Sequence, residues 1–199
     1  MSQDIILASG SSIRAQLLRN AGVTFDIQKP RVDESTILES LKQEEATPRD
    51  IADTLAEIKA RKVSEKFPNA LAIGCDQVLA YDGGILQKPT SIENARDQLL
   101  ELRGKRHFLM SAAVICEHGQ PIWRHVSVVR LYMRDFSDEY LTEYLERNWG
   151  EIQHCVGCYQ LESEGLRLFS RVEGDYFAVL GLPMLELLNF LALRGLIPS

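Results

Sequence analysis

Residues 70–78, with the sequence ALAIGCDQV, are followed by a short turn that leads to Lys88. The apolar run at 70–73 predicts a buried strand, with Asp76 at its end where the chain leaves the core. Lys88 follows the turn at 82–84, so a carboxylate and an ammonium group could face one cleft. Such a pair suits a site that handles a metal ion and a phosphate, although an Asp and a Lys around a hairpin are commonly a surface ion pair.

The rest of the chain alternates between predicted strands and helices. Apolar periodicity and capping signals predict strands at 4–9 and 24–28, helices at 12–20, 48–66 and 92–102, a long hairpin of strands at 108–116 and 122–133, a helix at 138–147, a loop-and-strand region at 155–174 and a last helix opened by Pro183. The polar stretch at 30–45 is expected to be irregular. This mixture favours an α/β or α+β fold in which helices flank a sheet.

Length and composition suit one domain spanning residues 1–199, because the chain has 199 residues of which 45% are hydrophobic. The formal net charge of −6 argues against general binding to nucleic acid or to a membrane, which usually requires a basic excess. The sequence shows no signal peptide and no long apolar segment, so a cytoplasmic location is expected, with the four cysteines reduced.

Residues 9–14, with the sequence SGSSIR, lie where a predicted strand turns into a helix. Backbone N–H groups and the helix dipole favour an anion there, while Ser11 adds a hydroxyl and Arg14 a fork of donors. Phosphate is the natural ligand of such a junction. An ordinary N-cap beside a surface Arg explains the same residues, and spacing alone favours it.

Two further segments offer charged groups. Asp33 and Glu34 are adjacent acids in a polar stretch, and Glu34 could meet Asp76 across a cleft to hold a divalent cation; adjacent acids in loops are otherwise solvated. Lys59 interrupts a mostly apolar row of its predicted helix, either to reach water at the boundary of the buried face or to aim an ammonium into a site.

The sequence HCVGC at 154–158 has the spacing of a metal-binding or redox pair. A zinc site normally needs a second pair of ligands, and the remaining cysteines, Cys75 and Cys116, are isolated. Two partly buried thiols are therefore expected at Cys155 and Cys158.

Taken in order, these segments resemble the Maf family of nucleotide pyrophosphatases over nearly the whole chain. The resemblance rests on residues 7–14, Val32-Asp33-Glu34, Lys59, Gly74–Val78, Lys88-Pro89, Leu102-x-Gly104-x-x-His107, Glu173–Asp175 and Gly181–Pro183. It implies a two-lobed α/β fold with a twisted mixed sheet, a central cleft and often a homodimer. The implied reaction is hydrolysis of a nucleoside triphosphate to the monophosphate and pyrophosphate.

The resemblance also implies roles for the charged residues. Asp76 is expected to hold a divalent metal, Mg²⁺ or Mn²⁺, and to orient or deprotonate the water that attacks the α-phosphorus, with Glu34 as the second metal ligand. Lys59 and Lys88 are expected to neutralise the phosphate oxygens. Ser11 and Arg14 are expected to cradle the triphosphate.

Base preference is expected to depend on Gln77 and Glu162, which match the branch of the family that is specialised for 7-methyl-GTP. A carboxylate can accept from guanine N1–H and N2–H together, whereas uracil and thymine offer one such donor. Ile13 departs from that branch, which has Trp there, and so gives no cation–π attraction to a methylated base. Glu164 takes the place of Glu162 if the segment is shifted by two residues.

A second hypothesis is a non-catalytic, nucleotide-binding regulator of cell division, since the family is also associated with inhibition of septum formation. Tight nucleotide binding without turnover in any metal would distinguish such a regulator from an enzyme.

Overall fold

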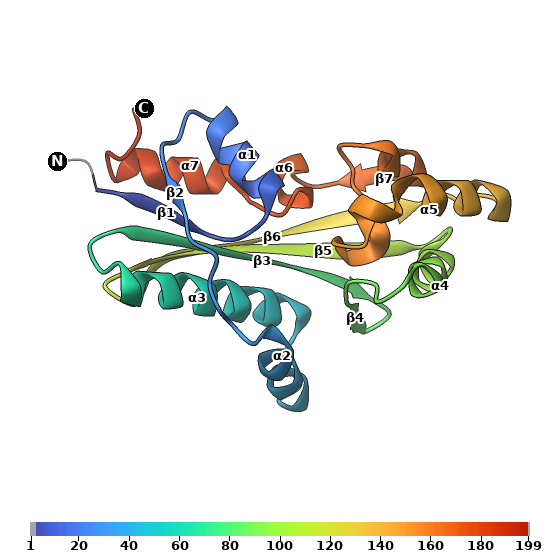
Figure 1. The fold of residues 1–199 in the computed structure, drawn as a ribbon, viewed down its shortest axis with the longest axis horizontal. Helices are drawn as coiled ribbons and strands as arrows, with labels where there is room; N and C mark the ends of the chain where they lie inside the picture. Colours follow the sequence, from blue (N-terminus) through green and yellow to red (C-terminus); the bar gives the residue numbers. More distant parts are fainter. Residues whose placement is uncertain (1–2, 199) are drawn as a thin grey trace.

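The computed structural model describes residues 3–198 and contains a seven-stranded mixed sheet (Figure 1). Its strand order is β2-β1-β3-β5-β6-β7, and β4 pairs with β3 outside this path. The strands are β1 (Ile5–Ala8), β2 (Asp26–Ile27), β3 (Leu71–Tyr81), β4 (Gly84–Leu86), β5 (Arg106–Glu117), β6 (Gln120–Met133) and β7 (Phe169–Glu173). The helices are α1 (Ser12–Asn20), α2 (Glu34–Gln43), α3 (Pro48–Lys66), α4 (Ile92–Leu102), α5 (Asp138–Ile152), α6 (Tyr176–Val179) and α7 (Met184–Leu193), with 3₁₀ turns η1 (Val156–Cys158) and η2 (Glu164–Leu168).

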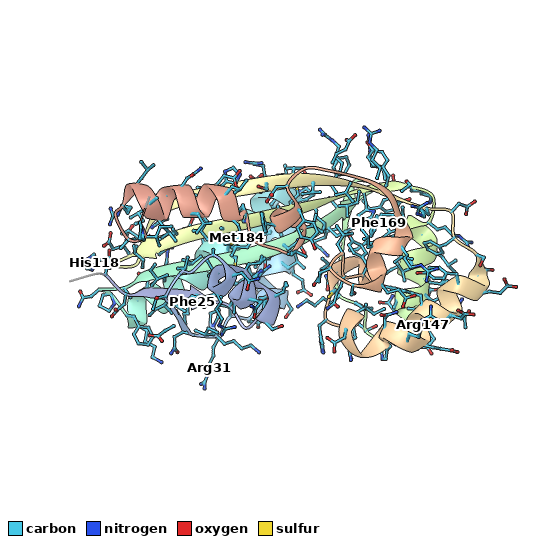
Figure 2. The ribbon with its side chains drawn as sticks, turned by 90° about the horizontal axis from the view of Figure 1, so that it is seen from above. Phe25, Arg31, His118, Arg147, Phe169 and Met184 are labelled. Atoms are coloured by element: carbon cyan, nitrogen blue, oxygen red, sulfur yellow. The ribbon has the colours of Figure 1, made fainter. Side chains whose placement is uncertain are left out.

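Helices cover both faces of the sheet, which confirms the expected α/β class. Helices α1 and α7 lie on one face and α3 on the other, while α4 and α5 gather at the far end of β3, β5 and β6 (Figure 1). The apolar core is divided in the same way. Met184 belongs to the cluster around α1 and α7, and Phe169 to the cluster around α4 and α5, in different halves of the molecule (Figure 2). The long central strands join these two lobes.

Strand β3 is longer than the sequence predicts, and Asp76 lies in its middle rather than at its end. One side of the strand faces the core of α1 and α7 through Leu71, Ile73 and Cys75. The other side, which carries Asp76, faces α3. The strand continues through a buried carboxylate because a lysine on α3 pairs with it, which offsets part of the cost of burying the charge.

The turn between β3 and β4 is confirmed as a tight hairpin. Asp82 and Gly83 both have positive φ, 48° and 75°, as a two-residue type I′ turn requires. Tyr81 pairs with Gly84 across it, and the chain then runs on to Lys88.

The expectation of an irregular segment at 30–45 is wrong, because α2 occupies Glu34–Gln43. Asp33 caps this helix by accepting a hydrogen bond from the backbone N–H of Thr36. Ile37, Leu38 and Leu41 form its apolar stripe and pack against the core beside α3. A stripe of three apolar residues in a polar stretch gives too weak a periodicity to reveal the helix.

The other elements agree with the predictions in type and differ in length. The second strand shrinks to Asp26–Ile27, and the helix predicted at 138–147 continues to Ile152. The helices at 48–66 and 92–102 are capped by Thr47 and Ser91, each of which accepts a hydrogen bond from a backbone N–H. Among the helices of residues 3–198, none combines the length and apolar character needed to cross a lipid bilayer.

Candidate active site

The site forms where β3 loses its neighbour along one edge. Strand β1 pairs with β3 as far as Gly74, and β4 pairs with it only from Leu79, so residues 75–78 have no strand beside them on that edge. A cleft of about 1040 Å³ opens there. In open α/β sheets, ligands bind outside the carboxyl ends of strands, and this cleft lies beyond the carboxyl end of β1.

Both lobes contribute charged groups to this cleft. Its lining includes the cationic side chains Arg14, Lys29, Lys59 and Lys88 and the acidic side chains Glu34, Asp76, Glu151 and Glu162. The cleft thus balances four cationic side chains against four acidic ones in a protein whose net charge is −6. Eight site residues predicted from the sequence line this one cleft: Ser11, Arg14, Glu34, Lys59, Asp76, Gln77, Lys88 and Glu162.

Lys59 forms ion pairs with both candidate metal ligands, Asp76 and Glu34. Its Nζ lies 2.5 Å from Asp76 Oδ1 and 3.0 Å from Glu34 Oε1. Lys59 and Asp76 are each 7% exposed, whereas the side chain of Glu34 is 56% exposed. The ammonium group therefore points toward Asp76. This excludes the alternative in which Lys59 reaches water at the boundary of the buried face.

Burial and pairing act against each other on this cluster. Burial raises the pKa of Asp76, and this outweighs the opposite effects of Lys59 and Arg14. Burial lowers the pKa of Lys59, but the attraction of Asp76 and then Glu34 outweighs it, so the net pKa of Lys59 is raised. Lys59 stays charged at neutral pH, beside a carboxylate that is more basic than usual.

The junction before α1 combines a cap with a half-buried arginine. Ser11 is the N-cap and accepts from the N–H of Arg14. Arg14 Nε donates to the carbonyl of Gly181 at 2.8 Å, and its Nη1 donates to the carbonyl of Cys75 at 3.1 Å on the unpaired edge of β3. Arg14 is thus tied to the backbone of two elements, and within residues 3–198 its Nη2 makes no hydrogen bond.

Lys88 and Glu162 are exposed residues on the wall formed by the second lobe. The competing residue Glu164 lies outside the cleft and is bound to Arg147 at 2.8 Å and to Asn148 at 2.9 Å. These hydrogen bonds lower the pKa of Glu164 to about 2. Glu164 therefore holds η2 against α5, and Glu162 is the acid of this segment that a ligand can reach.

The side chains of Gln77 and Asp76 lie on opposite faces of β3. Its Nε2 donates to Ser111 Oγ at 2.8 Å and to the carbonyl oxygens of Ala178 and Val179 at 3.0 and 2.9 Å. Ser111 also donates to the carbonyl of Ala178. Gln77 therefore fastens α6 to the sheet at the edge of the cleft.

Sequence reasoning missed Lys29, which also lines the cleft. Its methylene groups lie over Gly10, where an added Cβ would come 3.2 Å from Lys29 Cδ. Lys29 stands between two short polar motifs, and no periodicity marks it. The sequence shows Gly10, but it does not show that Lys29 packs against this glycine.

The HCVGC segment at 154–158 contains two of the four cysteines. Cys158 is buried and Cys155 half-buried, and both are free thiols. Among residues 3–198, no group of three or more His, Cys, Asp and Glu side chains is arranged to hold a metal ion.

The carboxylates of Asp76 and Glu34 nevertheless fit a divalent cation that arrives with phosphates. Mg²⁺ is commonly bound by one or two protein carboxylates, with water and substrate phosphates completing its shell. Asp76 and Glu34 meet at one ammonium group, each through one oxygen, so each carboxylate retains a second oxygen. The donor set therefore suits a metal bound together with a polyphosphate.

Comparison with known proteins agrees with this geometry. The family model described as Maf-like protein matches residues 4–193. The chain is 60% identical over 198 residues to a protein of Roseobacter denitrificans and 60% identical over 199 residues to one of Ruegeria pomeroyi, with all of each chain covered. It is 51% identical over 191 residues to a protein of Caulobacter vibrioides, covering 96% of both chains. All three relatives are named nucleoside triphosphate pyrophosphatase. The chain belongs to the Maf family.

Proposed function

We propose that this protein hydrolyses a nucleoside triphosphate to the monophosphate and pyrophosphate. One observation carries the proposal: in a large cleft, Lys59 Nζ lies within 3.0 Å of a carboxylate oxygen of both Asp76 and Glu34, although the three residues are distant in sequence. The names of the relatives support hydrolysis over the regulatory alternative.

The buried carboxylate of Asp76 suits a general base. A base works best when its pKa approaches the operating pH, and burial raises the pKa of Asp76 in that direction. Asp76 orients a water molecule toward the α-phosphorus and takes its proton. Lys59 stays charged in the same cluster and stabilises the negative charge that develops on the phosphate oxygens.

Groups on both walls of the cleft position the triphosphate. Lys29 and Lys88 provide ammonium groups at the cleft, and Ser11 marks the N-terminus of α1, which favours an anion. Arg14 acts mainly by fixing this N-terminus against β3, with Nη2 left for a phosphate oxygen. Asp76 and Glu34 would hold the divalent metal, Mg²⁺ or Mn²⁺. Such a metal supplies charge neutralisation for the leaving pyrophosphate.

Glu162 selects the base. Its carboxylate is free of ion pairs within residues 3–198, and it lines the cleft next to Gln160 and Leu161. A guanine can donate to it twice, and its methylated, cationic form adds attraction between opposite charges. Ile13 on the facing wall gives apolar contact without a cation–π component.

Glu162→Gln should weaken guanine substrates more than pyrimidine substrates. Loss of a charge-assisted pair of hydrogen bonds predicts that kcat/KM for GTP and 7-methyl-GTP falls by about 10- to 100-fold, while that for UTP changes by less than about threefold. Pyrophosphate release across a nucleotide panel measures this. Glu146→Gln, at an exposed position of α5 outside the cleft, is the matched control. Equal losses on purines and pyrimidines would contradict base selection by Glu162.

The same panel, run with Mg²⁺ and with Mn²⁺, tests the proposed function itself. We expect pyrophosphate and a nucleoside monophosphate as the only products. Tight nucleotide binding with no turnover in either metal would instead support the regulatory role.

A further inference from the structure

His107 is a buried titratable residue that the proposed chemistry does not use. It lies near the start of β5, is 0% exposed, and ends the motif Leu102-x-Gly104-x-x-His107. Its Nε2 shares a hydrogen bond of 2.8 Å with the hydroxyl group of Tyr159. Its Nδ1 is buried and has no hydrogen-bond partner among residues 3–198.

The surroundings of this pair are apolar and aromatic. The rings of His107 and Phe169 have centroids 5.9 Å apart, and Tyr159 meets Phe169 edge-on at 4.7 Å. Burial lowers the pKa of His107 to about 4, so its ring is neutral at neutral pH. The hydrogen bond therefore joins two neutral groups in the core of the second lobe, where no water competes for it.

Tyr159 belongs to the wall of the cleft. Residues 155, 156 and 159–162 all line the cleft, and Glu162 is three residues from Tyr159. The backbone turns sharply before it, with φ of 76° at Gly157 and 60° at Cys158. The tyrosine ring fills this turn so closely that a Cβ on Gly157 would lie 2.6 Å from Tyr159 Cε1. Tyr159 is thus the anchor of the wall segment, defined here as residues 155–162.

We propose that His107 is a positioning residue for base recognition, which acts through its hydrogen bond to Tyr159. The sheet supplies His107 and the wall segment supplies Tyr159, so this bond fixes the wall segment relative to β5. Tyr144 adds a second tie, donating from its hydroxyl to the carbonyl of Cys158 at 3.1 Å. Glu162 then approaches the base at one distance and angle. The inference rests on the proposed function, because it assigns Glu162 to the base.

The test separates the hydrogen bond from packing. Tyr159→Phe keeps the ring and removes the hydroxyl, and His107→Leu removes the partner. His107→Gln places an amide nitrogen near the position of Nε2 and should restore the bond. Phe169→Leu disturbs the same aromatic cluster but makes no side-chain hydrogen bond, so it controls for loss of packing.

The readout is the ratio of Kd values for non-hydrolysable α,β-methylene analogues of GTP and UTP, with Tm measured alongside. We expect Tyr159→Phe and His107→Leu to reduce the preference for guanine by about tenfold, as loss of one well-placed hydrogen bond would. His107→Gln should retain most of the preference. Phe169→Leu should lower Tm and leave the ratio unchanged.

Two results would overturn the inference: a ratio unchanged in all variants while Tm falls, or a wild-type protein that binds both analogues equally. Because binding is measured without turnover, failure of the proposed function appears separately, as wild-type protein that binds nucleotide and releases no pyrophosphate.

Discussion

Replacement of Asp76 by Asn should abolish turnover while leaving the fold intact. The variant keeps the shape of the side chain and an oxygen that accepts from Lys59 Nζ, but it can neither take a proton nor carry charge to a metal. Loss of a general base alone lowers rates by about 10²- to 10⁴-fold, and loss of a metal ligand adds to this. We expect kcat/KM for the best nucleotide to fall by at least about 10³-fold.

Stability should respond differently from activity. The raised pKa of Asp76 means that its ionised form opposes folding at neutral pH, because the unfolded chain releases this proton more readily. In Asp76→Asn, the stability gained by removing the buried charge offsets the stability lost because Lys59 pairs with a neutral amide and not with a carboxylate. We therefore expect Tm to change by no more than about 5 °C in either direction.

Asp97→Asn, on an exposed position of α4 outside the cleft, is the matched control and should retain full activity. Pyrophosphate release and thermal unfolding are the two measurements. A variant at Asp76 with activity within about tenfold of the wild type would remove this residue from the mechanism, since that loss is smaller than a general base accounts for.

Local signals in the sequence predicted most of the fold. The helices at 48–66 and 92–102 carry a cap at their first turn, and the Asp82-Gly83 turn has the residues that a type I′ hairpin demands. Such features depend on neighbours within a few residues. They are therefore visible without tertiary structure.

The errors arose where a distant contact decides the local structure. Asp76 looked like the end of a strand because a lone carboxylate is costly to bury, and its partner Lys59 is 17 residues away on another element. Helix α2 was missed because its three apolar residues stabilise it only by packing against the core beside α3, and this contact is not apparent from the sequence.

The candidate site was predicted as a set of residues rather than as a geometry. The resemblance identified the charged groups, and the structure places them along one cleft. The choice between Glu162 and Glu164 needed Arg147, which binds Glu164 from α5. Arg14 was expected to serve phosphate, yet two of its donor nitrogens bind backbone carbonyls. Composition and spacing hold no information on either contact.

Gly74 should be the glycine least able to accept a side chain. A Cβ built there would lie 2.1 Å from the carbonyl oxygen of Ala56 and 2.5 Å from the backbone nitrogen of Ala60. Both atoms belong to the backbone of α3, so no side-chain rotation relieves the clash, and the helix must move away from β3. Overpacking of this kind costs about 1–3 kcal/mol, and we expect Gly74→Ala at or above the upper end.

The same displacement of α3 should also lower the catalytic rate, because Lys59 lies on α3 between Ala56 and Ala60, the two residues that a Cβ on Gly74 would meet. A shift of about 1 Å in a positioned group costs about 10²-fold in rate. Gly74→Ala is therefore expected to lower kcat/KM by roughly that factor as well as lowering Tm. Gly84→Ala is the matched control, since its Cβ would meet only the Tyr81 carbonyl oxygen at 3.7 Å. If Gly74→Ala loses stability but keeps full kcat, the close approach of α3 to β3 serves packing alone, and the position of Lys59 tolerates more movement than this mechanism allows.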